Sequence, residues 1–159
     1  MKNLNFTIII DTREQTPWTF DNYVTASKKL DTGDYSILGM EDIFTIERKK
    51  SVSEVANNIS ESRFDKELIR LKNYKHKFLL LEFNLKDVLN YPIGSNVPKK
   101  MWEKLKITNK YILKYLTEIA IFYDLQVIFC DDSDGAEEMA LSIIKRMIEL
   151  YGEQKLKNI

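Results

Sequence analysis

The order of short apolar runs and amphipathic stretches is the feature that most constrains the fold of this chain. The N-terminal third contains short runs, bounded by turn residues, that are typical of β-strands. They are Asn5 to Ile10, Val24 to Lys29, Tyr35 to Leu38 and Ile43 to Lys49. The turns Asp31-Thr32-Gly33-Asp34 and Gly39 to Asp42 separate the later runs. Because the runs follow one another closely, they predict an antiparallel meander.

Helical patterns dominate the rest of the chain. Ser51-x-x-Glu54 has the form of a capping box, in which a hydroxyl and an acid satisfy the first free amides of a helix. Further helices are predicted over Arg63 to Tyr74, over Leu85 to Leu89, as one or two joined helices over Lys99 to Tyr123, and from about Asp131 to Gly152. The apolar runs between them, Phe78 to Phe83 and Gln126 to Cys130, predict buried strands.

Strands separated by helices need crossover connections and therefore pair in parallel. The expected fold is an α/β domain with a mixed central sheet, in which antiparallel hairpin strands are followed by parallel strands and helices cover both faces. The chain has 159 residues, enough to bury a core. We expect a single domain over residues 1–152 and a flexible C-terminal tail over residues 153–159.

Composition excludes several kinds of site. The single cysteine, Cys130, and the single histidine, His76, exclude an intramolecular disulfide and a zinc site built from these residues. No stretch is apolar enough to span a membrane and the N-terminus lacks a signal core, so we expect a cytoplasmic protein. The net charge is zero, and basic pairs such as Lys28-Lys29 and Lys99-Lys100 indicate either a locally positive groove or solvated faces.

Acidic residues gather at the ends of the predicted strands. Glu47 and Lys49 lie two residues apart on one strand and so share a face of the sheet. Asp34 precedes the neighbouring strand, and Asp11 and Glu14 follow the first one. Hard divalent cations such as Mg²⁺ prefer oxygen ligands, usually one or two carboxylates plus waters, which Asp34 and Glu47 can supply. Lys49 can orient an attacking water or offset a phosphate charge.

The same pattern has a plainer interpretation. A Glu-x-Lys pair on a strand is usually a surface charge pair, and an Asp-x-Arg-Glu segment after a strand often contains a local ion pair. Arg13 and Arg48 could instead bind phosphate oxygens in a forked geometry. The combination of these acids and bases in one order, each at a strand end, favours a metal-dependent phosphate site.

The motifs Asp11-Thr12-Arg13-Glu14, Gly33-Asp34-Tyr35 and Ile46-Glu47-Arg48-Lys49 resemble those of the XPF-type nuclease domain, a branch of the PD-(D/E)XK nuclease superfamily. The predicted helix from Arg63 and the run Phe78-Leu79-Leu80-Leu81-Glu82 extend the resemblance over nearly the whole chain. The resemblance implies a restriction-endonuclease-like, three-layer α/β/α fold, here in a stand-alone form without helicase or helix-hairpin-helix domains.

By this resemblance, Asp34, Glu47 and Asp11 are the expected ligands of Mg²⁺ or Mn²⁺, and Lys49 is the expected catalytic lysine. Glu14 joins Asp11 as a supporting acid of the active site. Contacts to DNA or phosphate are expected from basic residues near these motifs: Arg13, Arg48, Lys50 and Arg63. For Arg63, an ion pair with a helix acid is an equal alternative.

The chain also departs from the family pattern. The family usually places an aspartate four residues after the catalytic lysine, and Ser53 occupies that position here. Glu54 follows, as if Lys50 were an inserted residue, which leaves the role of Glu54 open between the active site and the helix cap. Glu82 either faces the site or ends a buried strand.

The expected function is a metal-dependent DNA endonuclease that hydrolyses phosphodiester bonds and selects flapped, forked or branched duplex DNA in repair or recombination. The alternative is a non-catalytic DNA-binding or scaffold subunit on the same fold. Such relatives tend to lose the acids and the lysine, which this chain retains. The resemblance also implies a homodimer formed through the C-terminal half, and association with the nucleoid if the source is bacterial or phage.

Overall fold

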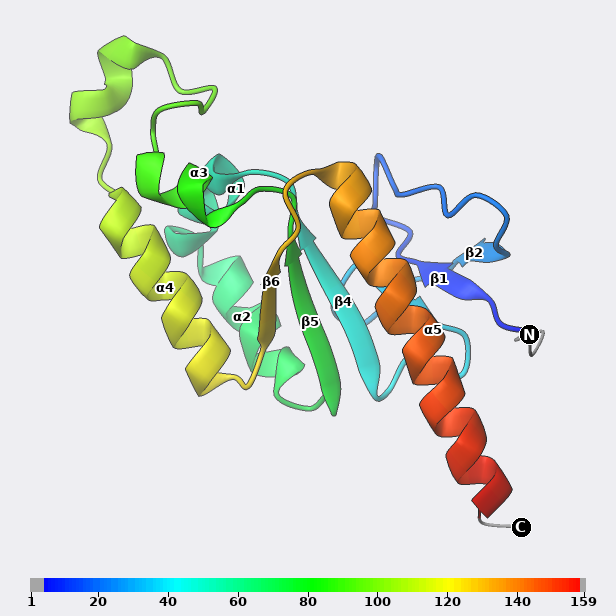
Figure 1. Cartoon of the computed structure of the whole chain (residues 1–159). Coiled ribbons are helices and arrows are strands. Elements are labelled where there is room, and N and C mark those ends of the chain that lie inside the picture. The colour runs from blue at the N-terminus through cyan, green and yellow to red at the C-terminus, as the bar shows by residue number, and fades with distance from the viewer. Residues whose placement is uncertain (1–4, 158–159) are drawn as a thin grey trace.

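The computed structural model describes residues 5–157, and the side chains of residues 5–152. The strands are β1 (Ile8–Ile10), β2 (Thr25–Ser27), β3 (Tyr35–Ile37), β4 (Phe44–Lys49), β5 (His76–Leu81) and β6 (Gln126–Phe129). The helices are α1 (Val52–Ile59), α2 (Ser62–Leu71), α3 (Leu85–Asn90), the 3₁₀ helix η1 (Lys99–Lys104), α4 (Asn109–Phe122) and α5 (Ser133–Lys157). Figure 1 shows their arrangement around the sheet.

A six-stranded mixed sheet lies at the centre, in the order β2-β1-β3-β4-β5-β6. β3 pairs antiparallel with β1 and β4, whereas β4, β5 and β6 run parallel, as expected. The predicted meander is wrong at β2, which pairs in parallel with the outer side of β1. The loop between β1 and β2 buries Trp18 and Phe20 and returns the chain to the start of β1, where the Ile8 N–H donates to the Val24 carbonyl.

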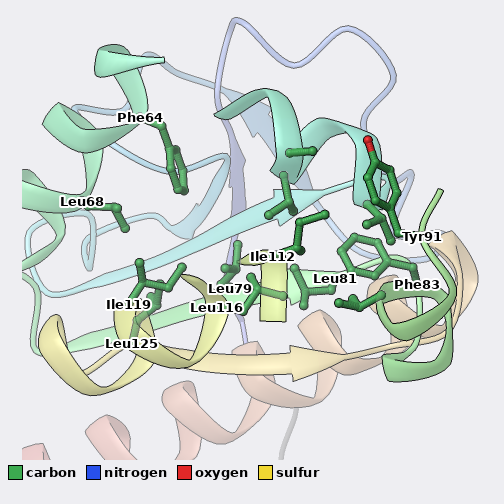
Figure 2. Close-up of a cluster of buried hydrophobic side chains, with 14 of the residues drawn as sticks. Phe64, Leu68, Leu79, Leu81, Phe83, Tyr91, Ile112, Leu116, Ile119 and Leu125 are labelled. Atoms are coloured by element: carbon green, nitrogen blue, oxygen red, sulfur yellow. The ribbon is translucent and has the colours of Figure 1, made fainter. Parts of the chain in front are cut away.

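Helices cover both faces of the sheet and complete the expected three layers (Figure 1). On one face, Leu79 and Leu81 of β5 pack with Leu116 of α4 in the cluster that Figure 2 shows. On the other face, Leu80 packs with Ile144 of α5. Successive strand residues point to opposite faces, so a strand covered on both sides is apolar at nearly every position. This explains the continuous apolar run of β5.

The structure decides one helical prediction between its two alternatives and differs from another. The stretch Lys99 to Tyr123 is divided into η1 and α4, because Leu105 is extended and Thr108 caps α4 by accepting the Tyr111 N–H at 3.2 Å. Gly152 does not end α5, which continues to Lys157. A glycine inside a helix costs only about 1 kcal/mol, which the rest of a long helix can offset. The flexible tail over residues 153–159 stays a prediction. Within residues 5–157, no helix has both the length and the apolar character needed to cross a membrane.

Candidate active site

Backbone hydrogen bonds bring the predicted acids to one end of the sheet. The Asp11 N–H donates to the Asp34 carbonyl at 2.8 Å, and the Asp34 N–H donates to the Ile46 carbonyl at 2.8 Å. The Arg48 N–H in turn donates to Oδ2 of Asp34 at 2.8 Å. These bonds fix the end of β1, the start of β3 and the end of β4 relative to one another. Asp11, Asp34 and Glu47 consequently line the same cleft.

Gly33 makes this close approach possible. Its φ is +85°, a left-handed conformation that side chains with a Cβ rarely adopt. A Cβ at this position would lie 1.8 Å from Oγ1 of Thr45, inside the neighbouring strand. The Thr45 hydroxyl is itself fixed, because it donates to the Thr32 carbonyl at 3.0 Å. Glycine is therefore required here for Asp34 to reach β4.

Glu47 and Lys49 share one face of β4, as predicted, and both side chains are buried. Nζ of Lys49 lies 3.2 Å from Oε1 of Glu47 and 4.0 Å from Oε1 of Glu54. The same ammonium lies 4.3 Å from the centroid of the Phe64 ring, which closes one side of the site. A buried pair of this kind is held by its surroundings, unlike the surface charge pair of the plainer interpretation.

The electrostatics of the site disfavour two free carboxylates. Burial, together with the charges of Glu47 and Glu14, raises the pKa of Asp34 well above its usual range. Burial also raises the pKa of Glu47 to about 7, against the opposing charge of Lys49. Burial alone would lower the pKa of Lys49, but the neighbouring carboxylates raise it, so the ammonium stays charged. The site therefore carries an unfavourable concentration of acids that a cation would relieve.

The residues present fit a hard divalent cation. Among the described side chains, those of residues 5–152, no group of three or more His, Cys, Asp or Glu is arranged as a metal cage. Mg²⁺ does not need such a cage, because one or two carboxylates with waters and substrate phosphates suffice. Asp34 and Glu47 can supply these oxygens, and because burial raises the pKa of each carboxyl group, a bound cation would stabilise the ionised forms.

Asp11 lies beside this pair with its oxygens engaged. Its carboxylate accepts from Nε of Arg13 at 2.8 Å and from the Leu30 N–H at 2.8 Å. Although burial acts to raise it, these donors hold the pKa of Asp11 below its usual value. Asp11 is thus ionised and fixed in orientation. Arg13 lies at the rim of the cleft, and Nη2 of its guanidinium donates to Asp11 and to the Leu30 carbonyl.

The guanidinium of Arg48 takes part in a buried network behind the cleft. Its side chain points to the opposite face of β4, where the guanidinium lies 4.7 Å from the centroid of the Trp18 ring. Nε and Nη2 donate to the two carboxylate oxygens of Glu82 at 2.8 Å and 3.2 Å. Nη1 donates to Oε2 of Glu14 and to the Thr16 carbonyl. The guanidinium therefore stabilises the fold through these internal partners, and the predicted phosphate contact of Arg48, which also lines the cleft, stays a prediction.

The same network includes Glu82, whose role was left open, and Glu14, the predicted supporting acid. Glu82 accepts from Arg48 and from Nε1 of Trp18 at 3.0 Å, so it belongs to this buried network on the opposite face. Glu14 accepts from the Tyr35 hydroxyl at 2.8 Å while it lines the cleft, and so connects the two faces. Tyr35 and Arg48 therefore hold Glu14 at the edge of the site.

Helices α1 and α2 form the opposite wall of the cleft, whose volume is about 600 Å³. Arg63 lines it from α2 and Lys50 from the position after β4, and their phosphate contacts stay predictions. Glu67 and Arg70 also line the cleft, although they were not among the predicted site residues. Their spacing from Arg63 was the available signal, because residues four and seven apart share a helix face.

Glu54 lies where both of the roles left open for it are possible. The Ser51 hydroxyl caps α1 by accepting the Glu54 N–H at 3.1 Å. The Glu54 carboxylate accepts the Lys50 N–H at 2.7 Å, one residue earlier than in a standard capping box. The other oxygen of this carboxylate faces Lys49, so Glu54 lines the cleft while it caps the helix.

Comparison with known proteins places this geometry in a family. The family model described as "ERCC4 domain" matches residues 10–142. No curated protein matches the chain. Two similar solved structures are "XPF from Aeropyrum pernix", with a TM-score of 0.61, and "XPF from Aeropyrum pernix, complex with DNA", with a TM-score of 0.67. Each is 18% identical to this chain, which at that level shows a shared fold.

The matches cover nearly all of this chain but only part of each matched structure. The two comparisons cover 92% and 91% of this chain. The chain spans 65% and 66% of the two matched structures, so about a third of each has no counterpart here.

Proposed function

Because the chain belongs to the ERCC4 domain family, we propose that it is a metal-dependent endonuclease that hydrolyses phosphodiester bonds in DNA. Asp34, Glu47 and Lys49 line one cleft, with the lysine ammonium 3.2 Å from the glutamate, and this arrangement supports the proposal most strongly. A scaffold subunit would gain nothing from carboxylates buried beside one another, since their repulsion destabilises the fold.

Each residue of the site has a proposed task. Asp34 and Glu47 hold Mg²⁺ or Mn²⁺, with Asp11 fixed beside them. The cation supplies charge stabilisation at the phosphate and activation of a water nucleophile. Lys49 orients this water or offsets the charge that develops on the phosphate. Glu14 supports the site from its edge, where Tyr35 and Arg48 hold it.

The substrate is proposed to be duplex DNA with a flap, fork or branch. One similar structure is titled as a complex with DNA, which supports a DNA substrate for this chain. Arg13, Lys50 and Arg63 line the open cleft, where they can reach backbone phosphates. We further propose a homodimer through the C-terminal half, where Ile121 and Phe122 of α4 are exposed. Light scattering tests this state, and a monomer at all concentrations would contradict it.

Cleavage of labelled DNA tests the catalytic proposal. Flapped, forked, junction and single-stranded substrates are incubated with wild type, with Asp34→Asn and with the control Asp42→Asn, which changes an exposed acid beyond the other end of β3. We expect cleavage only with Mg²⁺ or Mn²⁺, a loss of at least about 100-fold in Asp34→Asn, and an unchanged rate in Asp42→Asn. Equal cutting by wild type and Asp34→Asn would refute the site assignment.

A non-catalytic DNA-binding subunit remains the second candidate, and metal titration separates the two. The nuclease proposal predicts Mn²⁺ binding to wild type that Asp34→Asn weakens. A wild-type protein that binds DNA but no Mn²⁺ above background would favour the scaffold.

A further inference from the structure

A projecting basic segment lies outside the site described above. We define the arm as residues 92–108, which connect α3 to α4 through η1 and extend away from the sheet (Figure 1). The arm contains Lys99, Lys100, Lys104 and Lys106 against one acid, Glu103, for a formal charge of +3. Because the chain has a net charge of zero, the remainder carries −3. The arm therefore concentrates positive charge on an otherwise slightly acidic protein.

The lysine side chains of the arm are accessible to a binding partner. All four lysines are exposed, and none of them takes part in an ion pair of the described residues. A Lys ammonium without an internal partner carries its full charge to an incoming phosphate. By contrast, Lys114 on the neighbouring helix lies 3.8 Å from Glu118.

Internal contacts hold the arm in place. Nε1 of Trp102 donates to the Val97 carbonyl at 2.9 Å across the arm. Leu105 and Ile107 pack against the core cluster of α4. An anchored segment loses less conformational freedom on binding than a disordered tail does, so its lysines can contribute more to affinity.

The arm also adjoins the active-site cleft. A smaller cavity of about 220 Å³ is lined on one side by residues 50–53 and on the other by residues 93–96 of the arm. Lys50 lines both this cavity and the active-site cleft. A phosphate backbone that leaves the cleft past Lys50 would therefore meet the start of the arm.

We infer that the arm binds backbone phosphates of the duplex that flanks the scissile bond, through Lys99, Lys100, Lys104 and Lys106. This inference rests on the proposed function in taking DNA as the substrate. Such contacts are independent of base sequence and fix the position of the duplex. The acidic remainder of the protein would repel DNA, so the arm would supply much of the attraction.

Equilibrium DNA binding in EDTA tests the inference, because no metal-dependent cleavage can occur under this condition. The binding result can therefore be interpreted even if the protein proves not to be a nuclease. A quadruple variant replaces the four lysines with glutamine. A double variant, Lys99→Gln/Lys100→Gln, is compared with the matched control Lys75→Gln/Lys114→Gln. Duplexes of increasing length and a polyglutamate peptide serve as probes, and thermal unfolding verifies that each variant folds.

We expect the quadruple variant to bind a long duplex at least about tenfold more weakly near 0.1 M salt. Its slope of log affinity against log salt should fall by about 2 to 4, roughly one unit for each lost contact. Wild type should gain affinity as the duplex lengthens, and the quadruple variant should gain less. Equal affinities and slopes in the arm and control variants would overturn the inference. A variant that keeps DNA binding but loses polyglutamate binding would also overturn it, by making the arm a protein-docking surface.

Discussion

Nζ of Lys49 lies 3.2 Å from Oε1 of Glu47, and both side chains are buried at the end of β4. Each group makes the burial of the other tolerable, because an unpaired buried charge is strongly destabilising. The pair also separates two tasks within a few ångströms, since the carboxylate can hold a cation and the ammonium can act on the phosphate or water. Substitutions at the two positions should therefore have different signatures.

Lys49→Met should abolish cleavage without abolishing metal binding. The variant removes the ammonium but keeps both carboxylates, and the loss of a nearby positive charge should leave Mn²⁺ affinity equal or higher. We expect a fall of about 100-fold or more in the cleavage rate at about pH 8. Parallel calorimetry and cleavage assays check this, with Lys75→Met as the control. Cleavage within about twofold of wild type would exclude a catalytic role for Lys49.

Asp34→Asn should stabilise the metal-free protein at neutral pH. The pKa of Asp34 is raised in the folded state, so over the range above about 4 the folded protein holds a proton that the unfolded chain releases. The free energy of unfolding of wild type therefore falls as the pH rises through this range. Asparagine cannot titrate, and its carbonyl can still accept the Arg48 N–H.

Thermal unfolding in EDTA measures this effect. The melting temperature of Asp34→Asn minus that of wild type should be positive at about pH 8 and should shrink as the pH falls toward about 4. Added Mg²⁺ should raise the melting temperature of wild type more than that of the variant. A wild type that is the more stable protein at about pH 8 in EDTA would contradict the electrostatic account of the site.

Gly33→Ala should cost far more stability than Gly39→Ala. Both glycines have similar left-handed φ angles, of +85° and +91°. A Cβ at Gly33 would collide with Thr45, whereas a Cβ at Gly39 meets nothing within 4 Å. We expect a loss of about 1 kcal/mol in the unfolding free energy for Gly39→Ala and at least about 2 kcal/mol more for Gly33→Ala. Equal losses in urea unfolding would show that Thr45 does not confine this turn.

Arg48→Met should destabilise the fold strongly. Removing the guanidinium leaves Glu82 and Glu14 without their buried partner, and breaking such a pair costs about 3–5 kcal/mol. Arg146→Met is the matched control, because Arg146 pairs with Glu149 on the exposed face of α5 and should matter by less than about 1 kcal/mol. Urea unfolding compares the two, and similar small losses would mean that Arg48 is free for another role.

The sequence was sufficient for the fold class and for the grouping of the acids. The period of the strands, the crossovers and the resemblance to the XPF-type nuclease domain predicted the three layers, and the fold and family are confirmed. Asp34 and Glu47 came together because strand pairing is local in this part of the chain. The parallel pairing of β2 could not be predicted, since it depends on how the loop with Trp18 and Phe20 packs under the sheet.

The roles of individual bases were harder to predict than their positions. Arg48 and Lys49 are adjacent in sequence, yet alternation along β4 sends one into a buried network and the other into the cleft. Residue spacing alone could not show that the Arg48 guanidinium would donate hydrogen bonds to Glu82, which is distant in the sequence. Likewise, the sequence left the pair Lys99-Lys100 open between a positive groove and a solvated face, and the structure places it on the arm, whose residues 93–96 line the smaller cavity.

The cleavage rate of a forked duplex, measured across a Mn²⁺ titration for wild type and Glu47→Gln, tests the central claim most directly. The account predicts no cutting by wild type without metal, a saturating rise with Mn²⁺, and a loss of at least about 100-fold in Glu47→Gln at every concentration. Metal-independent cutting by wild type, or equal rates in the two proteins at saturating Mn²⁺, would contradict it.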